Sequence, residues 1–141
     1  DPNIATNDGC TPLLGAAERG NLAAVTELLA HQADPNLQNK DGHTPLFFAA
    51  RNGNSTVTAK LLRYGTSANV TNKYGCTPLH IASFQGHSAT AKKLLRHKAD
   101  PNATNMYGDT PLSLAKLQNN SAMVSLLETA IQKRVDELIF G

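Results

Sequence analysis

Histidine and cysteine are among the side chains of this 141-residue chain that could bind a metal ion or take part in catalysis. No histidine stands at metal-ligand spacing from another histidine or a cysteine, and the glycines form no phosphate-binding loop. We therefore expect no catalytic residue, no metal site and no cofactor, and we predict that the chain is not an enzyme. The residues considered are His31, His43, His80, His87, His97, Cys10 and Cys76.

Composition indicates a folded domain and excludes several other classes. Hydrophobic residues make up 40% of the chain and charged residues 17%, which excludes a disordered chain. Thirteen Lys and Arg against eleven Asp and Glu leave a net charge of +2, too small a surplus to favour nucleic acid as a partner. No apolar run approaches the roughly 18 residues of a membrane span. We expect a single domain without a membrane span.

A repeat of 33 residues runs through the whole chain. Thr-Pro-Leu recurs four times at this interval, each time two residues after a glycine, and begins at Thr11, Thr44, Thr77 and Thr110. A leucine pair follows in every unit and is shifted by one residue in the last, at Leu126-Leu127. Periods of this length are typical of a solenoid in which each unit packs on its neighbours.

Each unit carries the local signals of two helices. The threonine can cap a helix, and proline fits its first position. A glycine turn and a second helix with the leucine pair follow, and the unit ends in a turn that reads Asp-Pro-Asn in the first and third units and Ser67-Ala68-Asn69 in the second. The fourth unit departs from this pattern, with Asn119 in place of the turn glycine and Lys116 in place of an alanine. We expect an all-α fold of helix pairs joined by β-hairpin-like loops.

This pattern resembles the ankyrin repeat, whose Thr-Pro-Leu-His-x-Ala motif is matched throughout by residues 77–82. The resemblance implies an ankyrin-repeat solenoid over residues 1–141, with four repeats at about 5–37, 38–70, 71–103 and 104–130. It also implies that His80 bridges backbone groups between repeats. Cys10 and Cys76 lie two repeats apart, beyond the ~7 Å reach of a disulfide, so we expect free thiols and an intracellular protein, cytoplasmic or nuclear.

The two ends of the chain differ. The opening Asp1-Pro2-Asn3 is in phase with Asp34-Pro35-Asn36, so we infer a fragment of a longer array. A stripe of mostly apolar residues follows Ser121 at helical spacing: Met123, Leu127, Ala130, Ile131, Arg134, Leu138 and Ile139. We expect a helix extension over about 121–140 that caps the stack. The alternatives are a helix leading into another domain, or a self-association contact of an otherwise monomeric protein.

In the ankyrin family the hairpin tips and first helices form a concave groove for partner proteins. Carried onto this chain, the resemblance implies a groove with an aromatic floor over the third and fourth units, flanked by basic side chains. Such a groove suits an extended peptide with apolar anchors and an acidic residue. In the alternative, Phe84 and Leu117 turn inward and the tyrosines only cover the hairpins. The predicted partner-binding residues are Lys40, His43, Arg51, Lys73, Tyr74, Phe84, Met106, Tyr107 and Leu117.

A second cluster is basic and lies on the second helices of units two and three. It could meet phosphate or an acidic surface, but we favour a solvated helix face whose cations suit the helix dipole. Its members are Lys60, Arg63, Lys92, Lys93, Arg96, His97 and Lys98. The function we predict overall is protein–protein recognition by a scaffold. The alternative is an adaptor or substrate-recognition module of a larger protein whose activity lies outside this chain.

Overall fold

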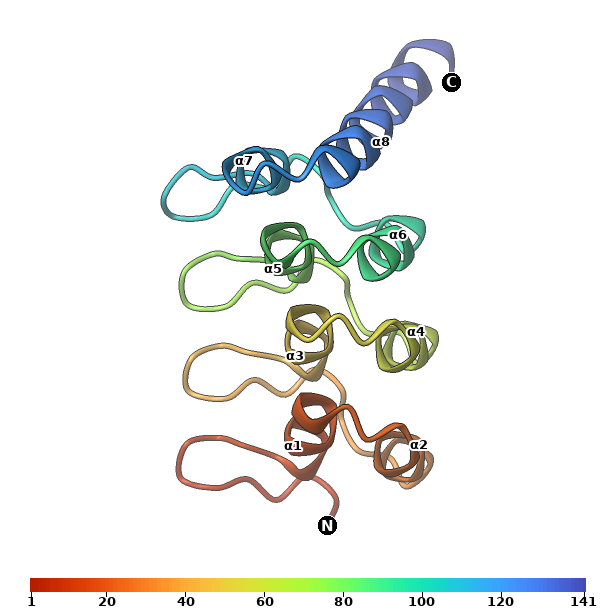
Figure 1. The fold of residues 1–141 in the computed structure, drawn as a ribbon. Coiled ribbons are helices and arrows are strands. Elements are labelled where there is room, and N and C mark those ends of the chain that lie inside the picture. The colour runs from red at the N-terminus through yellow and green to blue at the C-terminus, as the bar shows by residue number, and fades with distance from the viewer.

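The computed structural model describes residues 1–141 and contains eight helices and no strands. The helices form four pairs, and the pairs stack in chain order as two columns, with the hairpin loops projecting from the side of the first helices (Figure 1). The all-α prediction is confirmed. The first-helix column consists of α1 (Pro12–Arg19), α3 (Pro45–Arg51), α5 (Pro78–Gln85) and α7 (Pro111–Leu117). The second-helix column consists of α2 (Leu22–Ala30), α4 (Ser55–Arg63), α6 (Ser88–Arg96) and α8 (Ser121–Phe140).

Side-chain caps begin the helices where the sequence pattern predicts them. The hydroxyl of Thr11 accepts a hydrogen bond from the Leu14 N–H at 3.2 Å, and the other three threonines do the same in their own units. Asn21, Asn54 and Asn120 cap second helices in the same way. These bonds satisfy N–H groups that a helix leaves without an internal partner, so seven of the eight helices have a local start signal, whereas α6 begins after His87 without a side-chain cap.

One continuous apolar core runs between the two columns. Leu13, Leu46 and Leu79 are fully buried at equivalent positions of the first helices. The alanine three residues after each of these leucines is also buried, which lets neighbouring first helices approach closely. In the second-helix column, Leu61, Leu94 and Leu127 continue the core. Because units bury apolar surface against their neighbours, each depends on the next for stability.

The fourth unit keeps the repeat register despite its divergent sequence. Leu127 is fully buried 33 residues after Leu94, so the helix keeps the period of the repeat although the leucine pair is shifted by one residue in the sequence. Leu126 occupies the position of Lys93, and the exposed Glu128 occupies that of Leu95. Asn119 adopts a left-handed conformation, with φ of 55°. Asparagine tolerates this conformation better than most residues, so it can replace the turn glycine.

Helix α8 is longer than the other helices and extends past the stack (Figure 1). Met123 and Leu127 are fully buried against the preceding helices. Leu138, Ile139 and Phe140 are 85%, 66% and 83% exposed. The first part of the apolar stripe therefore packs on the preceding helices, and its last part extends beyond them, because α8 has 20 residues whereas α6 has 9 and α7 has 7. That this extension caps the stack stays a prediction. No helix is long and apolar enough to cross a membrane.

Candidate functional site

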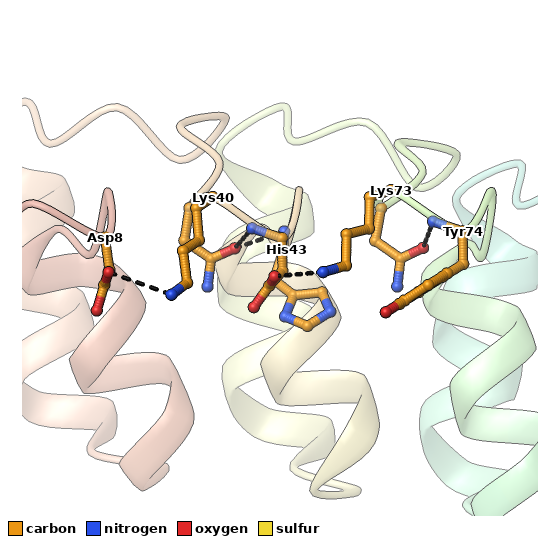
Figure 2. Close-up of polar contacts among 8 residues, drawn as sticks. Asp8, Lys40, His43, Lys73 and Tyr74 are labelled. Atoms are coloured by element: carbon orange, nitrogen blue, oxygen red, sulfur yellow. Dashed lines mark hydrogen bonds and ion pairs between the residues drawn. The ribbon is translucent and has the colours of Figure 1, made fainter.

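The hairpin tips are joined from unit to unit by a ladder of polar contacts. Lys40 Nζ lies 3.3 Å from Asp8 Oδ1, and Lys73 Nζ lies 2.8 Å from Asp41 Oδ1 (Figure 2). Backbone bonds run parallel to these ion pairs, from the Lys40 N–H to Asp8 O and from the Lys73 N–H to Asp41 O. The hydrogen bond with Lys73 lowers the pKa of Asp41, and the same bond raises the pKa of Lys73. Each hairpin is thereby held at a set distance from the next.

The ladder becomes aromatic in the third and fourth units. Tyr74 and Tyr107 occupy the positions that Asp8 and Asp41 hold in the first two units. Their rings stack with centroids 6.4 Å apart, and the Lys73 ammonium lies 5.1 Å from the Tyr74 ring centroid. The Met106 N–H still donates to Tyr74 O at 2.9 Å. One face of the stack therefore changes from charged to apolar while its backbone spacing is kept.

An apolar pocket of about 390 Å³ opens beside these tyrosines. Tyr74 and Tyr107 line it from the hairpin tips, Ile81 and Phe84 from α5, and Leu114 from α7. The other lining residues are Phe47, Asn72, Cys76, His80 and Asn105. We call this the groove pocket. Its volume lies within the ~300–1,000 Å³ range of ligand-binding pockets, so it can take a bulky apolar side chain.

His80 holds the wall of the groove pocket together. Its Nδ1 accepts from the Thr77 N–H at 3.0 Å, and its Nε2 lies 2.9 Å from the Asp109 carbonyl oxygen in the next unit. The ring is therefore neutral, with Nε2–H as the donor to Asp109. Burial lowers the pKa of His80, because the charged ring would be desolvated. The predicted bridging role of His80 is confirmed.

A second aromatic group lies one unit below the groove pocket. The His43 ring stacks on Phe47 with centroids 4.4 Å apart, and the Arg51 guanidinium lies 4.8 Å from the Phe48 ring centroid. Burial lowers the pKa of His43. Phe47 belongs to both groups, because it also lines the groove pocket. Aromatic side chains therefore follow one another from the second unit to the fourth, with Phe47 and Phe48 themselves buried.

The structure brings together some of the nine predicted residues and separates others. Tyr74, Phe84 and Tyr107 line the groove pocket and are 41%, 38% and 68% exposed. Phe84 does not turn inward, and neither does Leu117, which is 68% exposed. Leu117 and Met106 lie outside the lining of the pocket. The three predicted flanking cations are engaged within the fold: Lys40 with Asp8, Lys73 with Asp41, and Arg51 with Phe48.

Sequence reasoning missed three apolar residues that line the groove pocket. Ile81 lies three residues before Phe84 on the same helix, so both fall on one face. Leu114 is its counterpart one repeat later, and Phe47 lies at the position of His80 in the second unit. Helical spacing from Phe84 combined with the 33-residue period was the signal that could have found the first two.

The remaining chemistry-bearing residues are dispersed. Cys10 and Cys76 are both free thiols and both partly exposed. Cys76 lines the groove pocket, where it accepts a hydrogen bond from the Asn105 side-chain amide at 3.5 Å. No three His, Cys, Asp or Glu side chains are grouped so that they could hold a metal ion. The lining of the groove pocket is mainly apolar.

Stacked helix pairs with linked hairpins define this chain as a helical-repeat solenoid. One of its faces, formed by the hairpin tips and the first helices, carries the groove pocket. A family model described as ankyrin repeats, in three copies, matches residues 1–72 and 49–136. The chain belongs to the ankyrin repeat family, whose repeats are in general protein–protein interaction modules and typically non-catalytic. A comparison with curated proteins finds no match.

Proposed function

We propose that the chain binds a partner protein through the face formed by its hairpin tips and first helices. An extended segment of the partner lies along this face and places a large apolar side chain in the groove pocket. The observation that carries the proposal is the pocket itself, which is apolar, open to solvent, and lined by the third and fourth units together with Phe47 of the second. Exposed apolar surface of this kind usually marks an interaction site, and tyrosine is enriched among binding hot spots.

The scaffold supports tight binding because the pocket is formed before the partner arrives. Inter-unit hydrogen bonds from Met106 to Tyr74 and from His80 to Asp109 fix the two hairpins and helices that form its walls. A preorganised site loses less conformational entropy on binding than a flexible one. The flanking lysines already have carboxylate partners, so apolar contact rather than charge supplies most of the affinity. An intracellular location, cytoplasmic or nuclear, is part of this proposal and agrees with the free thiols.

The test compares partners captured from cell lysate by three forms of the protein. The first is wild type, and the second is Tyr74→Ala/Phe84→Ala/Tyr107→Ala. The third is the matched control Tyr64→Ala/Leu138→Ala/Phe140→Ala, which removes three other exposed apolar side chains. Tyr64 lies at the C-terminal end of α4, and the other two lie on α8. Circular dichroism checks that all three fold. With the captured partner purified, the pocket variant should bind at least about 100-fold more weakly, since hot-spot residues each contribute ~2 kcal/mol or more.

The control decides where the binding site lies. Under the proposal the control variant retains the partner with unchanged affinity. A partner retained by the pocket variant and lost by the control would place the site on the second helices or α8, and would contradict the proposal.

A further inference from the structure

The charges of the chain are divided sharply along the sequence. From Gly42 to Ala99 there is no Asp or Glu, while there are eight Lys and Arg. Residues 1–41 carry two cations and six carboxylates, and residues 100–141 carry three cations and five carboxylates. The net charges of the three parts are therefore −4, +8 and −2. A chain that is nearly neutral overall has a strongly basic middle.

Most of these cations gather on the second-helix column. Lys60 of α4 lies one repeat from Lys93 of α6, and Arg63 lies one repeat from Arg96. The two helices are neighbours in the column (Figure 1). With Lys92, His97 and Lys98, which are exposed on α6 and at its end, these residues form what we call the basic face. None of its members takes part in an ion pair of the structure.

The fold does not need cations at these positions. Cations near a helix C-terminus interact favourably with the helix dipole, but α2 and α8 end without any basic residue in the last turn. Equivalent positions on adjacent helices also place like charges one helix-packing distance apart, roughly 10 Å, where they repel. The hairpin ladder of the same protein pairs its lysines with aspartates. The cations of the basic face are therefore unpaired, unlike the lysines of the hairpin ladder.

A hollow of about 780 Å³ adjoins the basic face where α6 ends beside α8. Four cations line it: Arg96, Lys98, Lys133 and Arg134. Its two carboxylates are Asp100, which is bound by Arg134 at 2.6 Å, and Glu137. The basic face thus leads into a polar recess with an excess of positive charge.

The acidic residues on either side of the basic face limit the length of the anionic segment that can bind there. In the first unit, exposed Glu27 stands at the position of Lys60, and exposed Glu128 follows on α8 at the other edge. Two helix spacings cover roughly 20 Å, the length of about six extended residues. A nucleic-acid strand would run on into the acidic flanks. Backbone N–H groups at helix N-termini, which often bind phosphate, are also absent from this end of the helices.

We propose that the basic face is a second docking surface, for a short acidic segment of a protein. The segment lies across the C-terminal ends of α4 and α6, with carboxylates against Arg63 and Arg96, and reaches the recess beside α8. This surface is separate from the groove pocket, so the two can be occupied at once.

The test measures binding of a fluorescein-labelled octaglutamate peptide by fluorescence anisotropy in 50 mM and 500 mM salt. The variant Arg63→Gln/Arg96→Gln removes two cations from the basic face. The control Arg19→Gln/Lys116→Gln removes two cations from the last turns of α1 and α7, so net charge and helix-dipole effects are matched. Exposed ion pairs are individually weak, so we expect the basic-face variant to bind about tenfold more weakly, and the control to bind like wild type. High salt should weaken the wild-type complex.

Three outcomes would overturn the proposal. One is no measurable binding of octaglutamate to the wild type in 50 mM salt. Another is an equal loss in the two variants, which would show a response to net charge alone. The third is tighter binding of an eight-nucleotide oligothymidylate, lost in the basic-face variant, which would assign the surface to nucleic acid.

Discussion

Replacing Gly42 with alanine should lower the free energy of unfolding by about 3 kcal/mol. Gly42 has φ of 78°, a left-handed conformation that costs an L-residue about 1–2 kcal/mol. A Cβ at this position would also lie 2.9 Å from Lys73 N and 3.0 Å from Asn72 Cα. These are backbone atoms of the next hairpin and cannot move aside without breaking the ladder, so overpacking adds a further ~1–3 kcal/mol.

Gly108 provides a matched control for this prediction. It occupies the same turn in the fourth unit with the same φ of 78°, but an added Cβ would meet no atom within 4 Å. Gly108→Ala should therefore cost only about 1–2 kcal/mol, the conformational part. Urea unfolding followed by circular dichroism at 222 nm measures both. Equal losses in the two variants would show that the hairpins of neighbouring units do not pack as the structure has them.

Replacing His80 with serine should cost about 2–3 kcal/mol at pH 7.5 and flatten the dependence of stability on pH. Ser113 holds the same position in the fourth unit, where its hydroxyl accepts from the Thr110 N–H at 2.9 Å. Serine at position 80 can therefore keep the bond within the unit. It cannot reach Asp109, so a partly buried inter-unit bond is lost and the ring leaves a void.

The pH dependence follows from the direction of the pKa shift of His80. Its pKa in the folded protein lies below the ordinary 6.5, so the unfolded chain takes up the proton first as pH falls. Stability should decrease as pH falls below about 6.5 and level off, for this group, below the folded pKa. His43 acts in the same direction, since burial lowers its pKa also.

Unfolding curves at pH 7.5, 6.5 and 5.5 measure this effect for the wild type, His80→Ser and His97→Ser. His97 is exposed at the end of α6, so its variant controls for the replacement of a histidine by serine at the surface. The His80→Ser slope should be smaller, with the remainder due to His43. A slope identical to that of wild type would show that His80 does not exchange protons differently on folding.

The fold was predictable because its determinants are local and repeated. Thr-Pro fixes the start of each first helix within three residues, and the 33-residue period then places every unit against the next. The far part of α8 was not predictable in this way. Its apolar stripe indicates a helix, but helical spacing cannot show that no element lies alongside Leu138 or Phe140.

The candidate site was predictable only in part. Solvent-facing positions taken from the repeat correctly placed Tyr74, Phe84 and Tyr107 around one pocket. The ion pairs of Lys40 and Lys73 could not be read from the sequence, because each depends on a side chain reaching back by 32 residues to the preceding hairpin. The repeat places the hairpins side by side but does not specify the direction of a long side chain.

The most direct test of the proposed groove uses the two cysteines as reporters. Cys76 lines the groove pocket, whereas Cys10 holds the equivalent place two units away and does not. Both thiols are partly exposed and free, so the iodoacetamide labelling rate of each can be followed by mass spectrometry in the same sample. A saturating amount of the captured partner should slow labelling of Cys76 by about tenfold or more and leave Cys10 unchanged. Unchanged labelling of Cys76 in the saturated complex would contradict partner binding in the groove pocket.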